Sequence, residues 1–453
     1  GNGSSWALAY DQIFDALIRD TELAAFVNEM HRRQELPPTP DPKAVAAHIE
    51  RGLIREIITA VKDGRIHGNQ GMHQRTMIAA ALALDDPKET PQLIDWVFAP
   101  GTYQRDPNNP GREICTGGSL AQVLVSVMDR DGLGNEGAPG YSLWGASLQP
   151  AADLLEDNAK YRARSIYRDF PKYRQYYLAC KRWTCLEAVT PPIGDSGAAS
   201  AWGIVAPGAQ ALLRAYEIYR DPALARFAWQ MLGRNLDRVH GSIFSENPEA
   251  LREEVARLVS GPEPPLESGF MDGWGLAVLQ APHREHGRAL WVYYGRNTGH
   301  GHKDRLNLGL YAENIDMLPD LGYPEYASGR PKDSAWCRNN ASHNVVTVDG
   351  AAQNSSYTGR LLSFEPEGKA RLADLSSDGI YPNCTTYRRT AWLVDASARY
   401  SYVLDLFRVR GGKEHTLSLH GPPGEVTATG LVLKRQEDRK STRLNSSHQI
   451  ISY

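Results

Sequence analysis

The hydrophobic pattern of this chain changes its period at one proline-rich stretch, and this change constrains the fold more than any other feature. Up to residue 260 the apolar residues recur at the spacing of amphipathic helices. From residue 266 they alternate with polar residues, as in half-buried strands. The stretch between the two patterns has the sequence GPEPP. We therefore predict an α+β multidomain protein, with a helical domain over residues 1–260 and an antiparallel β-sandwich over residues 266–436.

The helical domain is predicted to be an array of antiparallel helical hairpins, because polar loops separate its helices. No tight sequence repeat accompanies them, so a solenoid is less favoured. Residues 102–116 are predicted to form a loop. The predicted helices span residues 6–30, 42–62, 76–84, 91–97, 120–128, 143–155, 161–183, 209–219, 222–232 and 248–259.

The sandwich is predicted from many short strands with Gly or Asp turns between them. The strand pattern stops near residue 437, and residues 437–453 resemble translated adapter sequence. We expect this tail to be an artefact and exclude it from the fold. The chain begins inside a helical pattern without Met, so we also expect an N-terminal truncation. The predicted strands span residues 275–280, 290–294, 305–312, 344–348, 361–365, 391–395, 402–408 and 416–420.

The composition argues against several classes of protein. The formal net charge is -3, so the chain lacks the positive field that attracts nucleic acids. No apolar run reaches the roughly 18 residues that a transmembrane helix needs. The five cysteines are odd in number and form no CxxC pair, so neither a disulfide framework nor a cysteine-based zinc site is predicted. We expect binding to neither nucleic acid nor the membrane interior.

Two histidines lie two positions apart in a glycine-rich stretch that leads into a predicted strand. These are His300 and His302, and in an extended backbone their side chains point to the same side. Asp320 and His343 follow, each beside a predicted strand. Imidazole and carboxylate groups together are typical zinc ligands. A hydrogen-bonded His/Asp cluster without a metal is the alternative, and His343 alone is compatible with a structural role.

The segments GHGHKDRLNLGLYA, MLPDLGYP and RNNASHNVVTVDG together resemble the heparinase II/III-like family of polysaccharide lyases. The resemblance is strongest over residues 290–350 and extends to residues 66–75 and 131–145. It implies an (α/α) toroid, here incomplete at its N-terminus, followed by a β-sandwich, with the active site between them. It also implies β-elimination on a uronic acid-containing glycan, which leaves an unsaturated uronate end.

The resemblance implies catalytic roles for Asn69, His73, Tyr141 and His300. A lyase must neutralise the uronate carboxylate, remove the proton at C5 and protonate the leaving oxygen at C4. Asn69 and His73, at a helix start, match the element that neutralises the carboxylate. Tyr141, after the Glu136-Gly137 loop, matches the base and acid, although a phenol is a weak base unless a cation lowers its pKa. His300 matches a histidine that assists proton abstraction or carboxylate binding.

The same resemblance implies a metal set and a group of substrate contacts. The metal set is His302, Asp320 and His343, with zinc as the ion. Structural roles are the alternative for each of the site residues: capping for Asn69, packing for Tyr141 and surface ion pairs for the arginines. The residues that we predict to contact substrate are Gln74, Arg75, Glu136 and Arg338, with Asn340 as a further candidate.

The predicted partner is an acidic polysaccharide or oligosaccharide, and a homodimer is a candidate assembly. The resemblance implies a periplasmic or secreted protein. Two other functions stay open. A glycoside hydrolase would need two carboxylates across one cleft, for which Asp131, Glu136 and Asp195 are available. A non-catalytic carbohydrate-binding protein would need none of the catalytic residues.

Overall fold

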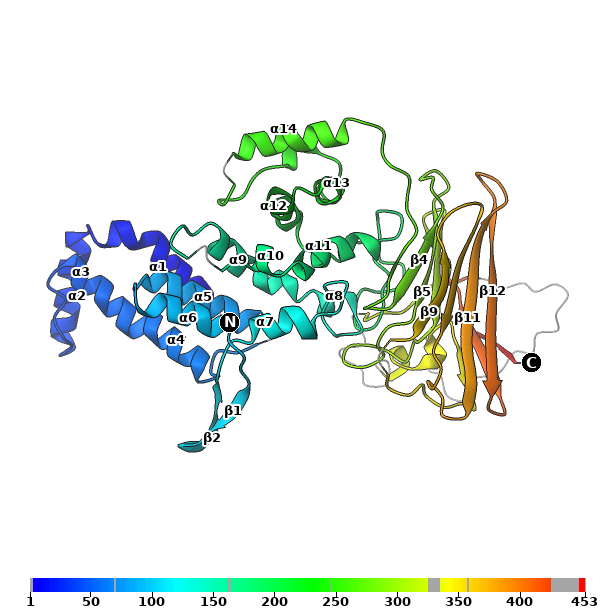
Figure 1. Ribbon diagram of the computed structural model, residues 1–453, viewed down its shortest axis with the longest axis horizontal. Helices are drawn as coiled ribbons and strands as arrows, with labels where there is room; N and C mark the ends of the chain where they lie inside the picture. The colour runs from blue at the N-terminus through cyan, green and yellow to red at the C-terminus, as the bar shows by residue number, and fades with distance from the viewer. Residues whose placement is uncertain are drawn as a thin grey trace. The chain divides into compact units, whose positions relative to one another are not determined.

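The computed structural model describes residues 3–68, 71–161, 164–245, 247–324, 335–356, 358–424 and 448–452. The chain forms two compact units, which we describe separately (Figure 1). Unit 1 comprises residues 1–127 and 144–173, and unit 2 comprises residues 128–143 and 174–453. The helices after residue 174 therefore belong to the same compact unit as the strands. The predicted domain limits, drawn where the secondary structure changes, stay a prediction.

Unit 1 is organised around helix α5 (Met72–Leu84), which is buried along most of its length. Its alanine-rich sequence presents little side-chain bulk, so α1, α4, α6 and α9 pack against it from several sides. The other elements of unit 1 are α1 (Gly3–Leu17), α2 (Thr21–Arg33), α3 (Pro42–Ile49), η1 (Glu50–Ile54), α4 (Arg55–Lys62), α6 (Glu89–Phe98), β1 (Tyr103–Asp106), β2 (Asn109–Cys115), α7 (Leu120–Gln122), η2 (Val123–Val127), α9 (Gly145–Glu156) and α10 (Ile166–Asp169).

Three sequence predictions in this region were wrong, and each has a local cause. The predicted helix over residues 6–30 is divided into α1 and α2, because the Asp20 side chain accepts a hydrogen bond from the Leu23 backbone and starts a new helix. The predicted loop over residues 102–116 is the antiparallel hairpin β1–β2. The predicted helix over residues 161–183 is divided into α10 and α11 (Lys172–Arg182), since Pro171 disfavours helical geometry in the residue before it.

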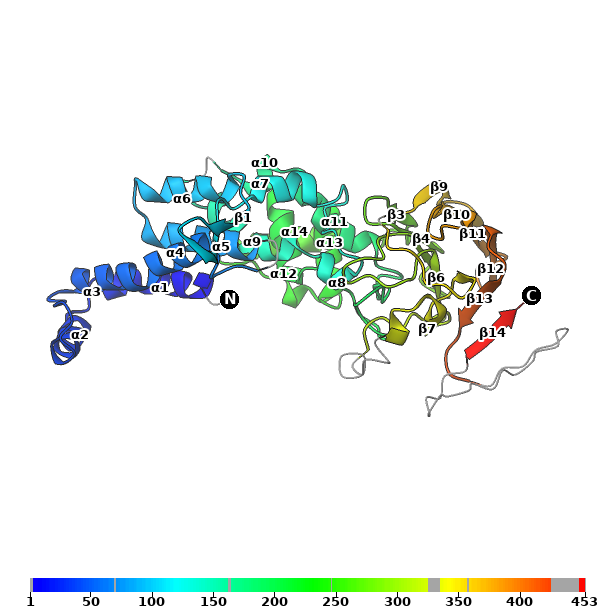
Figure 2. The same cartoon turned by 90° about the horizontal axis from the view of Figure 1, so that it is seen from below.

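Unit 2 carries three antiparallel sheets and a group of helices (Figures 1 and 2). The sheets have the strand orders β3-β4-β5-β6-β7, β12-β11-β10-β9 and β14-β13-β8. Their strands are β3 (Gly269–Met271), β4 (Leu276–Gln280), β5 (Arg288–Tyr293), β6 (Asn307–Ala312), β7 (Ile315–Asp316), β8 (Val346–Val348), β9 (Arg360–Glu365), β10 (Ala370–Ser376), β11 (Cys384–Asp395), β12 (Ser401–Gly411), β13 (His415–His420) and β14 (His448–Ser452).

The sheets of unit 2 share one hydrophobic core. Alternate residues of β4, β5 and β6 contribute to it together with residues of β8, β10 and β11. The opposite face of the β4–β6 sheet is also covered, because the Leu186 backbone donates a hydrogen bond to Gln280 and Trp202 packs on Tyr311. Every predicted strand corresponds to an observed one. Among the strands of unit 2, the sequence missed β3, β7, β10 and β14, and β10 lacks a clear alternation because charged residues interrupt it.

The helices of unit 2 follow the predicted pattern closely. The hairpin of α12 (Ala209–Tyr219) and α13 (Pro222–Met231) begins its second helix at Pro222, with the Asp221 side chain capping it. Helix α14 (Pro248–Val259) has the predicted bounds and packs beside α13 (Figure 2). The remaining short helices are α8 (Pro139–Ser142), η3 (Leu236–Arg238) and η4 (Asn340–Ser342).

The structure confirms a mixed fold of helices and antiparallel sheets, and the toroid and the sandwich stay predictions. Within the predicted tail, β14 pairs with β13, while residues 437–447 lie outside the described residues. The interpretation of that tail as an artefact stays a prediction. Among the helices of the described residues, none combines the length and apolar character that a membrane crossing requires.

Gly309 in β6 provides a test of this core. It lies directly opposite Trp291 of β5, and a Cβ at Gly309 would overlap the buried indole ring. We expect Gly309→Ala to lower the free energy of unfolding by about 1–3 kcal/mol, the usual range for overpacking. The matched control is Gly269→Ala in β3, where a Cβ would meet no atom within 4 Å. Urea unfolding measures both, and equal effects of the two substitutions would contradict this packing.

Candidate active site

Three loops of unit 2 meet backbone to backbone, and this contact determines the geometry of the site. A Cβ on Gly194 would lie 2.5 Å from the Gly137 carbonyl oxygen and 2.6 Å from that of His300. A Cβ on Gly137 would lie 2.7 Å from the Cα of Gly301. Gly194 also has a φ of +59°, which residues with side chains rarely adopt. Only glycine permits the three loops to approach so closely.

Asp195 follows Gly194 and is the centre of the cluster. Its Oδ2 accepts hydrogen bonds from His300 Nδ1 at 3.0 Å and from Arg338 Nη2 at 2.6 Å. Its Oδ1 accepts one from His302 Nε2 at 3.0 Å. Burial alone would raise the pKa of Asp195, but the hydrogen bonds from His302 and His300 and the charge of Arg338 outweigh it, and the net shift is downward. Asp195 is therefore a buried carboxylate with three donors.

Tyr141 and His300 form the partly exposed side of the cluster. Their rings stack at a centroid separation of 3.5 Å and an interplanar angle of 10°. Tyr141, in the short helix α8, is 40% exposed, so its phenol is accessible to a ligand. Glu136 Oε2 lies 3.7 Å from His300 Nε2. Burial raises the pKa of Glu136, and the charge of His300 opposes that shift.

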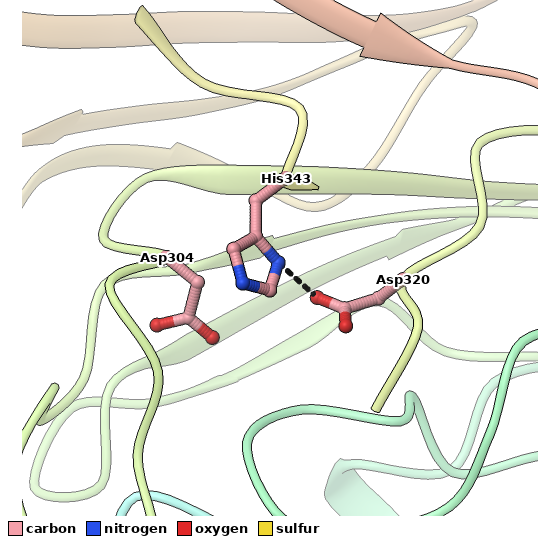
Figure 3. A group of neighbouring side chains, drawn as sticks. All are labelled: Asp304, Asp320 and His343. Atoms are coloured by element: carbon pink, nitrogen blue, oxygen red, sulfur yellow. Dashed lines mark hydrogen bonds and ion pairs between the residues drawn. The ribbon is translucent and has the colours of Figure 1, made fainter. Parts of the chain in front are cut away.

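A second, fully buried group lies in the same unit and consists of Asp304, Asp320 and His343 (Figure 3). One ligand atom from each residue lies within 4.8 Å of the other two. Figure 3 shows the imidazole of His343 between the two carboxylates, with Nδ1 at 2.9 Å from Asp320 Oδ2. Asp320 also accepts hydrogen bonds from Asn307 Nδ2 and from the Gly322 backbone. It is therefore the anchored member of the group.

The unsatisfied atoms of this group match what a metal ion requires. Among the described residues, both carboxylate oxygens of Asp304 and Nε2 of His343 are buried without a hydrogen-bond partner. Burial raises the pKa of Asp304 to about 7, although the charge of His343 opposes that shift. One imidazole nitrogen with two carboxylates is a donor set that zinc accepts. The residues present therefore fit a cation.

Two of the three residues predicted to bind the metal belong to this group. These are Asp320 and His343, whereas His302 lies beside the group and donates through Nε2 to Asp195, so its predicted role as a ligand stays a prediction. Asp304 takes the third place. The His302 ring lies next to His343, with centroids 5.5 Å apart, and its Nδ1 is buried without a partner among the described residues. His302 thus lies between the Asp195 cluster and the metal group.

The predicted residues near the start of α5 belong to unit 1. Asn69 lies outside the described residues. His73 is buried in the first turn of α5. Gln74 is also buried, and its amide accepts from the Gly71 backbone and donates to the Gly118 carbonyl, so it holds the preceding loop, and its predicted contact with substrate stays a prediction. Arg75 keeps its Nε buried without a hydrogen-bond partner among the described residues.

Sequence reasoning missed two residues of these clusters as members. Asp304 continues the alternation of His300 and His302, so the pattern H-x-H-x-D already indicated that it shares their side of an extended chain. Asp195 was noted only as one of several spare carboxylates. It lies more than a hundred residues before the histidines, and the GDSG sequence around it indicates a turn but no partner.

Comparison with known structures shows the fold class of the chain. A crystal structure of heparinase III matches with a TM-score of 0.57 and 15% identity, covering 85% of this chain and 53% of that one. A heparan sulfate lyase from Pedobacter heparinus matches with a TM-score of 0.55 and 14% identity, covering 85% and 52%. The chain therefore has the fold of heparinase III over most of its length, and it spans about half the length of these relatives.

Sequence comparison shows which family the C-terminal part of the chain is similar to. The family model described as Heparinase II/III-like, C-terminal matches residues 263–452. An alginate lyase from Stenotrophomonas maltophilia (strain K279a) is 26% identical over 177 residues, which are 35% of this chain and 24% of that protein. These matches confirm the resemblance predicted from the three segments around His300, Asp320 and His343.

His73 provides a pH test of unit 1. Burial, and secondarily the charge of His67, lowers the pKa of His73 to about 4, whereas an unfolded histidine titrates near 6.5. The stabilisation from neutral His73 is therefore complete above pH ~6.5 and is lost as the pH falls toward 4. Between pH 7.5 and 5 we expect this residue to account for a loss of about 2 kcal/mol.

The experiment compares urea unfolding at the two pH values for the wild type and His73→Gln. The variant should lose less stability on acidification than the wild type. The control is His240→Gln, in which an exposed histidine is replaced and the pH dependence should not change. An unaltered pH dependence in His73→Gln would show that the folded protein does not hold this histidine neutral.

Proposed function

We propose that this protein is a polysaccharide lyase that cleaves a uronic acid-containing glycan by β-elimination and leaves an unsaturated uronate end. The observation that carries the proposal is the stacked Tyr141–His300 pair, with the imidazole hydrogen-bonded to buried Asp195. It brings a phenol and an imidazole together on an accessible surface. The family match over residues 263–452 and the polysaccharide lyases among the relatives support the same chemistry.

The proposed reaction needs two proton transfers and no hydrolytic water. A base removes the proton from C5, the electron pair forms the C4=C5 bond, and the C4–O bond breaks as the leaving oxygen takes a proton. We assign these transfers to Tyr141, assisted by His300. Because His300 donates through Nδ1 to Asp195, its Nε2 is the nitrogen that remains for the substrate or for Glu136.

The substrate carboxylate also needs a positive or hydrogen-bonding partner, because charge builds toward an enolate when the C5 proton leaves. Arg338 is a candidate, since its side chain is 49% exposed although Nη2 binds Asp195. The roles predicted for Asn69 and His73 in neutralising this carboxylate stay predictions. The predicted homodimer and the periplasmic or secreted location also stay predictions.

A hydrolytic reaction receives less support from the same residues. Asp131 accepts hydrogen bonds from the Gly273 and Trp274 backbones, and Asp195 is occupied by three donors. Of the three carboxylates considered for a hydrolase, Glu136 has a buried oxygen without a hydrogen-bond partner among the described residues. A glycoside hydrolase needs two functional carboxyl groups.

The first experiment measures the ultraviolet absorbance of unsaturated uronate while the protein is incubated with alginate, heparan sulfate, heparin or hyaluronan. We expect a rising signal with at least one polymer, and a loss of about 100-fold or more in Tyr141→Phe, which cannot transfer the proton. Tyr400→Phe is the control, because Tyr400 is 64% exposed and contacts only Arg399 among the ring and cation contacts of the described residues.

Two outcomes would contradict the lyase. Release of reducing ends without any absorbance change would indicate hydrolysis and direct attention to Glu136. Binding of a polymer without any product would indicate a carbohydrate-binding protein. A polymer that is cleaved equally well by the wild type and Tyr141→Phe would keep the reaction class but remove Tyr141 from it.

We further propose that Asp304, Asp320 and His343 hold a zinc ion. The ion would supply positive charge and organise the loops that carry these residues. All three residues are buried, and the unsatisfied atoms of Asp304 and His343 support the assignment. Because the group is separate from the exposed Tyr141–His300 pair, we assign no step of the elimination to it.

Metal content after dialysis against zinc and removal of unbound ion tests this site. We expect about one zinc per chain in the wild type and much less in Asp304→Asn and His343→Gln, because each loses a ligand. Asp316→Asn is the control, since Asp316 is equally buried in unit 2 but lies outside the group. Retention of a full equivalent of zinc by both ligand variants would refute the assignment.

A further inference from the structure

We propose that Asp195 is a positioning residue that fixes the orientation and tautomer of both His300 and His302. One carboxylate serves the two imidazoles, with Oδ2 facing His300 Nδ1 and Oδ1 facing His302 Nε2, each at 3.0 Å. The inference rests on the proposed lyase only for its kinetic consequence. Its structural content, two histidines with opposite tautomers, is independent of any activity.

The position of Asp195 is determined by its backbone as well as by its side chain. The Asp195 amide donates to the His300 carbonyl at 2.8 Å, so the loop is bonded to the histidine segment through the main chain. Gly194 permits this approach, because any Cβ there would overlap the Gly137 and His300 carbonyls. The side chain of Asp195 is 3% exposed and therefore has little freedom to move away.

An ionised carboxylate only accepts hydrogen bonds, so both histidines must donate to it. His300 then carries its proton on Nδ1 and presents a lone pair on Nε2, the nitrogen near Glu136. His302 carries its proton on Nε2 and has a lone pair on Nδ1, which is buried without a hydrogen-bond partner among the described residues. The same rule operates between Asp320 and His343, whose Nδ1 is bonded and whose Nε2 is not.

Two further contacts, from Tyr141 and Arg338, help to hold the His300 imidazole in its orientation. The Tyr141 ring covers one face of His300 at 3.5 Å, and Asp195 holds its edge. Arg338 donates to the same Oδ2 and favours the ionised carboxylate. Carboxylates that orient a histidine in this way typically change activity or metal affinity by about 10- to 100-fold when removed.

Nitrogen-15 NMR of histidine-labelled protein at pH 8, with a chelator present, tests the tautomers directly. We expect the His300 signal to report a proton on Nδ1 and the His302 signal a proton on Nε2. His300→Gln and His302→Gln assign the two signals. In Asp195→Asn an NH2 group replaces one of the two oxygens and faces one of the two histidines as a donor, so at least that histidine should change its tautomer.

The effect of Asp195 on activity is tested by measuring kcat and KM on the polymer that the wild type cleaves. We expect Asp195→Asn to lower kcat by about 10- to 100-fold, with a smaller change in KM, because the tautomer of His300 acts mainly on the proton transfers. Asp316→Asn, another buried acid of unit 2 whose Oδ2 accepts from the Ser200 backbone, is the control and should alter neither the spectra nor kcat.

The two proposals fail separately in these experiments. A wild type without lyase activity overturns the proposed function, and the spectra still decide the role of Asp195. If the wild type is active but His302 carries its proton on Nδ1, the positioning role alone is overturned. The same follows if Asp195→Asn leaves the spectra and kcat unchanged. Because the wild-type spectrum is informative by itself, poor folding of Asp195→Asn does not prevent a decision.

Discussion

The close approach of glycine backbones is the constraint on which the site depends. Gly194 lies against the carbonyls of Gly137 and His300, and Gly322 lies against those of Ser196 and Gly197. Backbone hydrogen bonds accompany these contacts, from Asp195 to His300 and from Tyr323 to Gly197. The main chain therefore places Asp195 between the histidine segment and the loop of Asp320. The positions of the catalytic side chains therefore depend on main-chain contacts at glycines, where a Cβ atom would overlap a carbonyl oxygen.

Buried polar groups behind the site connect this arrangement to the sheets. Arg389 of β11 is fully buried and donates to the carbonyls of Leu306 and Asn344, and it pairs with Asp405. Leu306 is the residue before β6, and Asn344 follows His343. Burying a guanidinium has a large desolvation penalty, so Arg389 needs these acceptors in place to be stable inside the protein. The ends of two segments that carry site residues are thus bonded to the neighbouring sheet.

Local patterns in the sequence predicted most of the helices and strands of this fold, and the errors arose where those patterns were weak or concealed. The hairpin α12–α13 followed from Asp221 and Pro222, because capping and proline geometry act within one turn. The division of the first helix at Asp20 uses the same chemistry, but a continuous apolar pattern concealed it. The hairpin β1–β2 has few apolar residues and is largely exposed, so its sequence lacks the alternation of apolar and polar residues that predicts a strand.

The residues of the site also differ in whether a local sequence pattern could predict them. His300, Tyr141, Asp320 and His343 were found because short segments around them resemble a known family. Asp195 and its two imidazoles are joined only in three dimensions, and no spacing in the sequence connects them. His302 was assigned to the metal from the same resemblance, and the sequence could not show that Asp195 binds its Nε2 and leaves Nδ1 as the nitrogen open to a ligand.

The buried acids differ in how their charge is satisfied, and this difference connects the two clusters. Asp195 and Asp320 each have several hydrogen-bond donors, and their pKa values shift downward although burial opposes that shift. Asp304 is equally buried but has no hydrogen-bond partner among the described residues, and its pKa is raised. An unsatisfied buried carboxylate is costly and rare in native proteins. Burial alone would lower the pKa of His343, but the charge of Asp320 and the hydrogen bond with it outweigh burial, and the net shift is upward. A proton on His343 Nε2 and a cation are therefore the two ways in which these atoms can be satisfied. A cation would satisfy both oxygens of Asp304 and Nε2 of His343 together, and this is the physical basis of the proposed zinc site.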